Sequence, residues 1–504
     1  MEMEKQVKKL SNLLPISPLD NNLKKKSISG IIWNLTERLG NQFIRFFLGI
    51  ILARMLFPAD YGIVGLTTVV IVIAQIFIDG GFMMVLIQRK KNSDVEYSSV
   101  FWIKIVLSFI SYIFIYFSSF YIAQFYKIPQ LEAVLQVISL VLIISALSSV
   151  HKIKLTNELN FKGQAKIMLF STIVGGVFGI VLAYRGYGVW SLVYQNLAIN
   201  VIQTLIFWIY SRWIPSFNYC STFVKSIRKT GILFFLSNVL LVFYNNIYVM
   251  LIGKLFSAAT LGNYTRAAQF EQLPENTTNS IIVKVLFPIL TENKDDLVKL
   301  KSNTLMILSW LSFVITPIMV LLIINAERII TLLLTKKWIE SSGFLIVLCV
   351  SGIFIPINNT ILNIFNVLAK PLITTYVFLF KIIFSALCIM LLFNFGPLFI
   401  ANVIVVENII VLLILGIISN KIINLSTFEI FKSIGPSIIF NAISALIIGL
   451  ICKLQFLNTM NNFMYVLLTS TLFLIFVYLF NLLFKTAEIL VVNKTINNYV
   501  SKCF

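Results

Sequence analysis

The chain of 504 residues carries a net charge of +20, yet it is 59% hydrophobic and only 12% charged, about half the charge of an average soluble domain. Apolar runs of about 20 residues recur along its length, and each can cross a bilayer as a helix. Strands of a membrane barrel would be about ten residues long and would alternate in polarity. Composition therefore excludes a soluble domain and predicts an all-α integral membrane protein.

The apolar runs predict about fourteen spanning helices. In chain order they lie near residues 30–53, 61–87, 99–123, 131–150, 165–184, 187–210, 230–252, 260–289, 303–325, 341–363, 372–393, 397–419, 434–452 and 462–484. We expect two six-helix lobes in a pseudo-two-fold arrangement. The predicted parts are a cytoplasmic basic tail at 1–29, an N-lobe at 30–210, a cytoplasmic linker at 211–229, a C-lobe at 230–419, two further helices at 420–484 and a cytoplasmic tail at 485–504.

The basic excess has a topological explanation. With the N-terminus inside, most of the 40 lysines and arginines lie on the predicted inner segments, as the positive-inside rule requires. The charge therefore indicates orientation and not a nucleic-acid partner. An even number of spans places both termini in the cytoplasm.

Cysteine and histidine give no sign of a metal or cofactor site. The five cysteines are scattered, without CxxC spacing, so neither a disulfide framework nor a zinc site is expected. The single histidine, His151, is expected at the cytoplasmic surface. The first 29 residues are polar and basic and show no signal peptide.

A short duplication supports two lobes of the same orientation. Leu56-Phe57-Pro58-Ala59 is followed by Gly62, and Leu255-Phe256-Ser257-Ala258 is followed by Gly262. Each segment comes directly after the first span of a six-span block. The two blocks are therefore predicted to face each other around a central cavity.

The first span carries a polar stripe. Its members recur at spacings of four, three and four and therefore share one helical face; they are Asn34, Arg38, Asn41 and Arg45. Glu37 lies one position off the stripe and can partner one of the arginines. Two arginines on one face of a spanning helix must line water or meet an anion, so the stripe either faces a cavity or forms interhelical ion pairs.

The eighth span repeats this pattern. Arg266, Gln269 and Asn276 follow one face, and Glu271 and Glu275 follow a neighbouring one. Pro274, between them, removes a backbone donor and can kink the helix. One interpretation is a polar helix packed within the bundle. The other is a cavity wall with a cationic side for substrate and an acidic side for ion coupling.

Four further charged residues lie within spans, where a charge costs about 2.5–3.5 kcal/mol. Lys104 is close to a span start and is expected to extend to the interface. Lys381 lies deeper and is a candidate for the cavity. Asp79 and Glu407 could take up a proton or a sodium ion, although Asp79, beside two glycines, could equally end a tightly packed helix.

Several segments resemble the polysaccharide-biosynthesis flippases, the oligosaccharide-lipid branch of the superfamily that also contains multidrug extruders and the lipid II flippase. They are Ser29-Gly30-Ile31-Ile32-Trp33-Asn34, Ala53-Arg54-Met55-Leu56-Phe57-Pro58-Ala59-Asp60-Tyr61-Gly62, Asp79-Gly80-Gly81-Phe82, Leu86-Ile87-Gln88-Arg89, Asn160-Phe161-Lys162, Gly186-Tyr187-Gly188-Val189-Trp190-Ser191-Leu192, Leu261-Gly262-Asn263-Tyr264-Thr265-Arg266-Ala267 and Phe287-Pro288. The resemblance extends from Lys24 over nearly the whole chain.

The resemblance implies a transporter in the cytoplasmic membrane of a bacterium. Its substrate would be an undecaprenyl-diphosphate-linked oligosaccharide, turned from the inner to the outer leaflet by alternating access for surface polysaccharide synthesis. Arg38, Arg45, Arg266 and Lys381 match the cationic cavity that such flippases use. The expected partners are this lipid-linked substrate, membrane lipid, a coupling H⁺ or Na⁺ ion, and the polymerase or glycosyltransferases of the same pathway.

Three alternatives remain open from the sequence. A lipid II flippase shares the architecture. A multidrug antiporter would have twelve spans and an acidic site in place of an arginine stripe. A membrane glycosyltransferase or polymerase would need paired carboxylates or histidines in a large outer loop, and no such loop is expected here.

Overall fold

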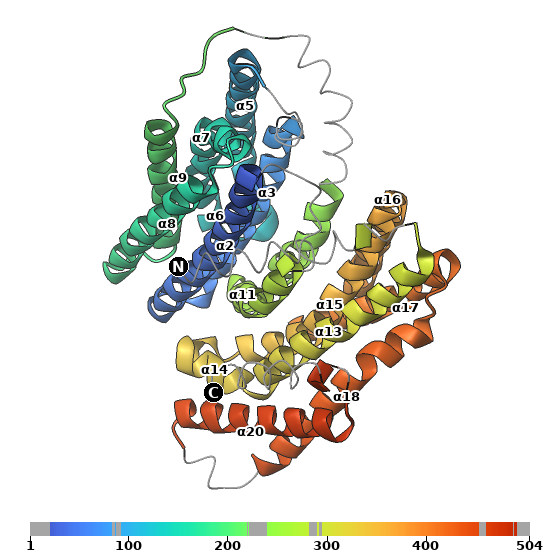
Figure 1. Cartoon of the computed structure of the whole chain (residues 1–504). Helices are drawn as coiled ribbons and strands as arrows, with labels where there is room; N and C mark the ends of the chain where they lie inside the picture. The colour runs from blue at the N-terminus through green and yellow to red at the C-terminus, as the bar shows by residue number, and fades with distance from the viewer. Residues whose placement is uncertain are drawn as a thin grey trace, which may run out of the picture. The chain divides into compact units, whose positions relative to one another are not determined.

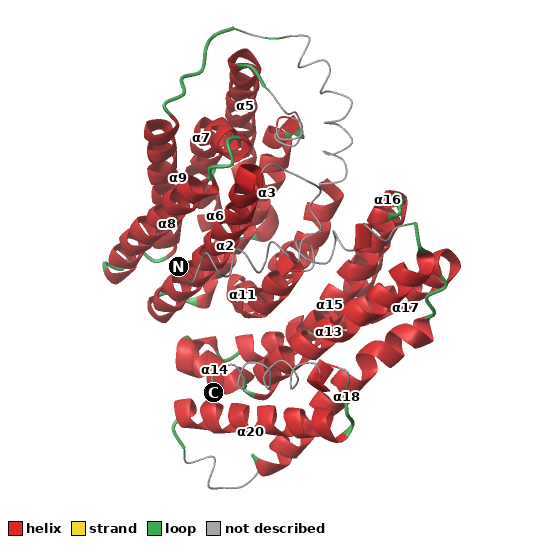
Figure 2. Cartoon of the chain, in the orientation of Figure 1, coloured by secondary structure: helices red, strands yellow, loops and turns green. Residues whose placement is uncertain are grey.

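The computed structural model describes residues 21–82, 86, 92–218, 220, 239–281, 290–291, 295–452, 460–486 and 488–490. The side chains of residues 21–32, 34–35 and 280–281 lie outside this description, as do the Ile87–Arg89 and Phe287–Pro288 segments. The described residues form helices joined by short connections, without a strand (Figure 2). Among the described residues, eleven helices are long and apolar enough to span a membrane, so the chain is an all-α, multi-pass membrane protein. The count of about fourteen spans stays a prediction.

The chain divides into two compact units, residues 1–243 and 244–504. Described helices of the first unit are α2 Asn21–Met55, α3 Pro58–Asp79, α5 Asp94–Tyr126, α6 Gln130–Ile138, α7 Leu140–Asn157, α8 Phe161–Tyr184 and α9 Val189–Ser211 (Figure 1). A further helix, Val239–Leu255, crosses the boundary. The second unit contains α11 Ala258–Ile281, α13 Leu297–Ile324, α14 Ala326–Leu333, α15 Ser341–Val367, α16 Pro371–Leu392, α17 Pro397–Ile423, α18 Thr427–Ile451 and α20 Asn462–Leu483, with short 3₁₀ turns at Lys336–Trp338 and Phe393–Phe395.

Each predicted span coincides with at least part of a helix, but the first helix begins earlier than predicted. α2 starts at Asn21, so residues 21–29, predicted as tail, are helical. Hydropathy could not show this, because Lys24–Lys26 are polar and yet are good helix formers. α2 and α11 are not among the eleven apolar spans, because both carry the polar and charged side chains described above.

The duplicated segments have the same local structure. Phe57 and Ser257 each separate two helices, and α3 and α11 begin one residue later. The turns are also bonded alike, since the amide of Leu56 donates to the carbonyl of Leu52 and that of Phe256 donates to that of Ile252, both at 2.9 Å. The repeat therefore marks an equivalent helix junction in each unit.

The helices of unit 1 pack closely at a glycine of α8, and those of unit 2 pack around the central helix α15. In unit 1, α8 lies between α2 and α9, where a Cβ on Gly179 would approach Cβ of Gln195 to 2.7 Å. In unit 2, α15 is the most buried spanning helix, packed by α11, α13 and α17. Apolar side chains also cover outward faces: on α5, Phe114, Phe117 and Tyr121 are all exposed, as expected for a lipid-facing surface.

Candidate functional site

One amide of the α2 stripe holds two helices together. Asn41 accepts a 2.8 Å hydrogen bond at Oδ1 from Thr172 Oγ1 on α8. Glu37, one position off the stripe, is buried. Asn34 lies on α2, but its side chain is outside the described part. Part of the stripe therefore forms an interhelical hydrogen bond, which is a different contact from the interhelical ion pairs considered above.

The two arginines of α2 are exposed, unlike Glu37. Arg45 makes neither a hydrogen bond nor an ion pair with any other residue that the structure describes. It lies ten residues before the end of α2 at Met55, well inside the predicted span. An exposed guanidinium at this depth must be solvated by water or neutralised by an anion.

An ion pair between a buried lysine and a partly exposed aspartate connects α3 and α5 within unit 1. Lys104 Nζ lies 2.8 Å from Asp79 Oδ1, and the side chains are 1% and 39% exposed. Gln75 Nε2 donates to the same carboxylate oxygen over 3.3 Å. The expectation that Lys104 extends to the interface is therefore wrong, because its ammonium finds a carboxylate inside the bundle.

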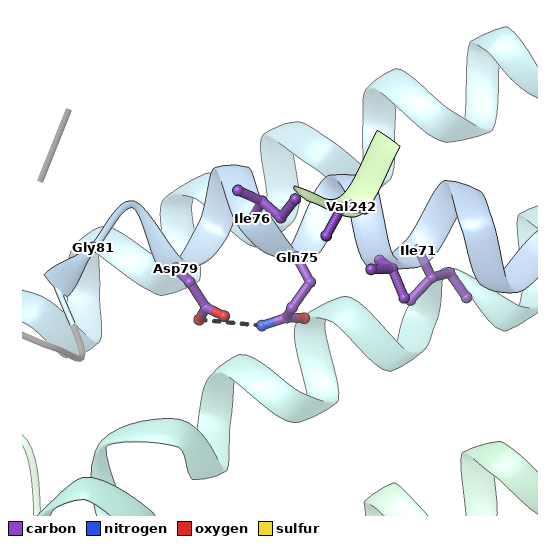
Figure 3. A pocket seen from close by; sticks show the side chains of 7 residues that line it. Ile71, Gln75, Ile76, Asp79, Gly81 and Val242 are labelled. Atoms are coloured by element: carbon purple, nitrogen blue, oxygen red, sulfur yellow. Dashed lines mark hydrogen bonds between the residues drawn. The ribbon is translucent and has the colours of Figure 1, made fainter. Parts of the chain in front are cut away.

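Asp79 also ends its helix and lines a cavity. The chain leaves α3 through Gly80, which adopts the left-handed conformation at φ 47° that glycine tolerates best. A cavity of about 370 Å³ lies beside it (Figure 3). Its lining is mostly aliphatic, with Gln75 and Asp79 as the polar members; the residues are Ile71, Val72, Gln75, Ile76, Asp79, Gly81 and Val242.

Unit 2 contains a second ion pair, in which both partners are buried. Lys381 Nζ on α16 lies 3.5 Å from Glu407 Oε1 on α17, and the side chains are 6% and 0% exposed. Glu407 also accepts hydrogen bonds from Tyr244 at 2.9 Å and Tyr248 at 3.1 Å, and from Ser385. The structure thus brings together one predicted substrate residue and one predicted coupling residue as partners.

On the cationic face of α11, Arg266 is buried against an aromatic turn. Arg266 is 5% exposed, donates to Gln269 Oε1 at 2.5 Å and lies 5.8 Å from the ring centroid of the buried Trp338. Asn276, further along the helix, is exposed. Arg266 and Lys381 thus have different partners, while Arg38 and Arg45 belong to the other unit.

The acidic face of α11 is partly buried, with Glu275 half-buried. Glu271 is 4% exposed, and its Oε1 has no hydrogen-bond partner among the residues described. Glu275 accepts from Asn279 Nδ2 at 3.3 Å and lies one turn after Glu271 on the same helix. Among the described residues, neither carboxyl group forms an ion pair.

His151, predicted at the surface, is fully buried. Its Nδ1 lies 2.6 Å from Ser211 Oγ, and the rings of Trp208 and Trp213 lie 4.7 and 5.2 Å away. The prediction was wrong because the chain after α9 brings Trp213 back over this part of α7. Within the described ranges, no group of three or more potential metal ligands is present.

Sequence reasoning did not identify the uncharged members of the unit 2 cluster. Tyr244 and Tyr248 are one helical turn apart on the helix Val239–Leu255, and Ser385 follows Lys381 by one turn. Asn408 directly follows Glu407 and accepts from Lys381 Nζ at 2.9 Å. For Ser385, the available signal was its spacing of one turn from the charged Lys381.

The fold and the sequence can be compared with known proteins. A family model described as a polysaccharide biosynthesis protein matches residues 51–343, more than half of the chain. The chain belongs to this family.

Relatives of the chain are found in surface-polysaccharide systems. It is 24% identical over 334 residues to the teichuronic acid biosynthesis protein TuaB of Bacillus subtilis (strain 168), covering 66% of this chain and 69% of that one. It is 23% identical over 331 residues to the succinoglycan biosynthesis transport protein ExoT of Rhizobium meliloti (strain 1021), covering 65% and 67%. The solved structure of the lipid II flippase MurJ, inward closed, has a TM-score of 0.69 at 17% identity and covers 91% of this chain and 100% of MurJ. The fold is thus shared with a flippase.

Proposed function

We propose that this protein moves a lipid-linked oligosaccharide from the inner to the outer leaflet of a bacterial cytoplasmic membrane by alternating access, for surface polysaccharide synthesis. It acts as a transporter and not as an enzyme. Family membership, the transport protein among the relatives and the flippase fold support this proposal. We propose that the lipid carrier is undecaprenyl diphosphate, because its anionic diphosphate group suits a cationic site.

The exposed Arg45 is the residue that best supports this proposal, because it can bind an anionic substrate. A guanidinium that lacks a carboxylate within the described chain is available to an anion, and its planar fork matches phosphate oxygens. Arg38, two turns earlier on the same face and also exposed, extends this surface. We assign the diphosphate to this pair.

We propose proton coupling through α11. Glu271 and Glu275 lie one turn apart on α11 without an ion-pair partner among the described residues, whereas Asp79 and Glu407 are each paired with a buried lysine. A carboxyl pair without an ion-pair partner can gain or lose its proton at lower electrostatic cost than a neutralised carboxylate. Replacing Glu271 by Gln is expected to weaken the dependence of transport on the proton gradient without preventing substrate binding.

The function is tested by the leaflet distribution of the undecaprenyl-diphosphate oligosaccharide in cells with and without the protein. Accumulation on the cytoplasmic side in its absence is expected. Arg45→Glu is expected to reproduce this accumulation, while Arg54→Glu, an equal charge change in the last turn of α2, should transport normally. An unchanged distribution without the protein, together with altered polymer length, would refute translocation and favour an enzyme that acts later; cytoplasmic accumulation of lipid II instead would redirect the proposal to that substrate.

A further inference from the structure

The ammonium group of Lys381 lies in a cage of oxygen atoms. It donates to Tyr244 Oη and to Asn408 Oδ1, each at 2.9 Å, and Glu407 Oε1 lies 3.5 Å away. An ammonium group has three N–H donors, and this cage offers three oxygens of three different chemical types. The lysine side chain is 6% exposed, so water contributes little to its solvation.

Other side chains hold these oxygens in place. Tyr248 at 3.1 Å and Ser385 both bind the second carboxylate oxygen of Glu407. Asn408 donates to Ser351 Oγ and to the carbonyl of Ile404, at 3.0 and 2.9 Å. The cage is therefore built by four helices: the helix Val239–Leu255, α15, α16 and α17. The group that occupies it is the ammonium of Lys381.

The cage contains one carboxylate, whose charge a single monovalent cation balances. Glu407 is fully buried, and a buried carboxylate without a counter-ion is strongly destabilising. Carboxylate, hydroxyl and amide oxygens are also the ligands that hard cations prefer. One negative charge among neutral oxygens matches a single positive charge, which the ammonium supplies.

We propose that Lys381 is the resident cation of a monovalent-cation site in unit 2, and that this site takes up Na⁺ when the ammonium is removed. The wild-type protein then needs no dissolved Na⁺ to neutralise Glu407, and a sodium gradient cannot act through this cage. Removing the lysine side chain leaves both the cage oxygens and the volume that the ammonium occupied, room for an ion and a coordinating water. This inference concerns ion binding and does not depend on the proposed substrate.

The test is thermal unfolding of the purified full chain in NaCl and in choline chloride at equal ionic strength. Wild type and Lys381→Arg should unfold at the same temperature in both salts. Lys381→Ala should be less stable in choline and should gain about 4 °C or more in saturating Na⁺. The double variant Lys381→Ala/Glu407→Gln, which lacks the carboxylate charge, should show no difference between the salts.

Two results would overturn the inference. One is a saturable Na⁺ stabilisation of the wild type that Glu407→Gln abolishes, which would mean that a dissolved ion already occupies the site. The other is a Lys381→Ala variant that is equally unstable in NaCl and choline, or that folds in neither salt, because a sodium-filled cage should restore the neutralised carboxylate. Binding of radioactive sodium to Lys381→Ala, measured beside the double variant, separates ion binding from a general salt effect.

Discussion

Removing Asp79 should destabilise unit 1 far more than removing its partner Lys104. The lysine side chain is 1% exposed and the aspartate 39%. Asp79→Asn leaves a buried ammonium without a carboxylate, and removing one partner of a buried pair costs about 3–5 kcal/mol. Lys104→Met leaves a carboxylate that water can reach, so the loss should be about 1 kcal/mol, as for an exposed pair.

The double variant Asp79→Asn/Lys104→Met completes the cycle. It contains neither charge, so its stability should lie within about 1 kcal/mol of the Lys104→Met variant. The assay is unfolding of the purified protein in detergent micelles, followed by tryptophan fluorescence against temperature. Lys154→Met is the matched control, because the Lys154–Asp94 pair has side chains 24% and 74% exposed and should contribute less than about 0.5 kcal/mol. Equal losses in the two single variants, or a double variant as unstable as Asp79→Asn, would refute the assignment of Lys104 as the buried charge.

Three further predictions concern other contacts. Gly179→Ala should lower the unfolding temperature, because its Cβ would meet Gln195 Cβ at 2.7 Å and overpacking costs about 1–3 kcal/mol, whereas Gly449→Ala, with open space around it, should not. His151→Phe should change stability by less than about 1.5 kcal/mol, the range for volume-conserving substitutions, since aromatic rings already surround the site; a larger loss in the same unfolding assay would show that the Ser211 hydrogen bond matters more than ring packing. Hydrogen bonds from the backbone and the side chain of Lys299 hold the pKa of Asp296 below its usual value. Asp296 therefore stabilises α13 fully above its usual pKa, and this stabilisation is lost as the pH falls through the lowered pKa. Asp296→Asn should reduce the loss of stability at acid pH in unfolding curves recorded against pH.

The positions of the helices were predictable because a spanning segment must satisfy its backbone internally and be apolar along its length. Helix ends were less so: α2 begins at Asn21 because Lys24–Lys26 continue a helix outside any apolar run. The duplicated turns at Phe57 and Ser257 were found from four letters of sequence. Their equivalence depended on local backbone bonding, which a short motif can specify.

The partners of buried charges were not predictable from periodicity. Lys104 and Asp79 are separated by 25 positions and Tyr248 and Glu407 by 159, and a helical pattern shows which face a residue occupies but not what lies opposite. His151 was misplaced for the same reason, because Trp213 reaches it only through the folded chain. The polar stripe of α2 was visible in the sequence, but the distinction between the packed Asn41 and the exposed Arg45 required the structure.

The two ion pairs help to explain why Arg45 of α2 is a stronger candidate for substrate binding than Lys104 or Lys381. Unit 1 neutralises Lys104 with Asp79, and unit 2 neutralises Lys381 with Glu407, each within its own helices. Both partners of each pair belong to the same unit. Arg45 has no comparable neutralisation inside the described part of unit 1, and its charge is therefore available to a ligand that arrives and leaves. A cation that must release its anion in each cycle cannot be held by a permanent carboxylate, which is why an exposed Arg45 suits a transported diphosphate better than the caged Lys381 does.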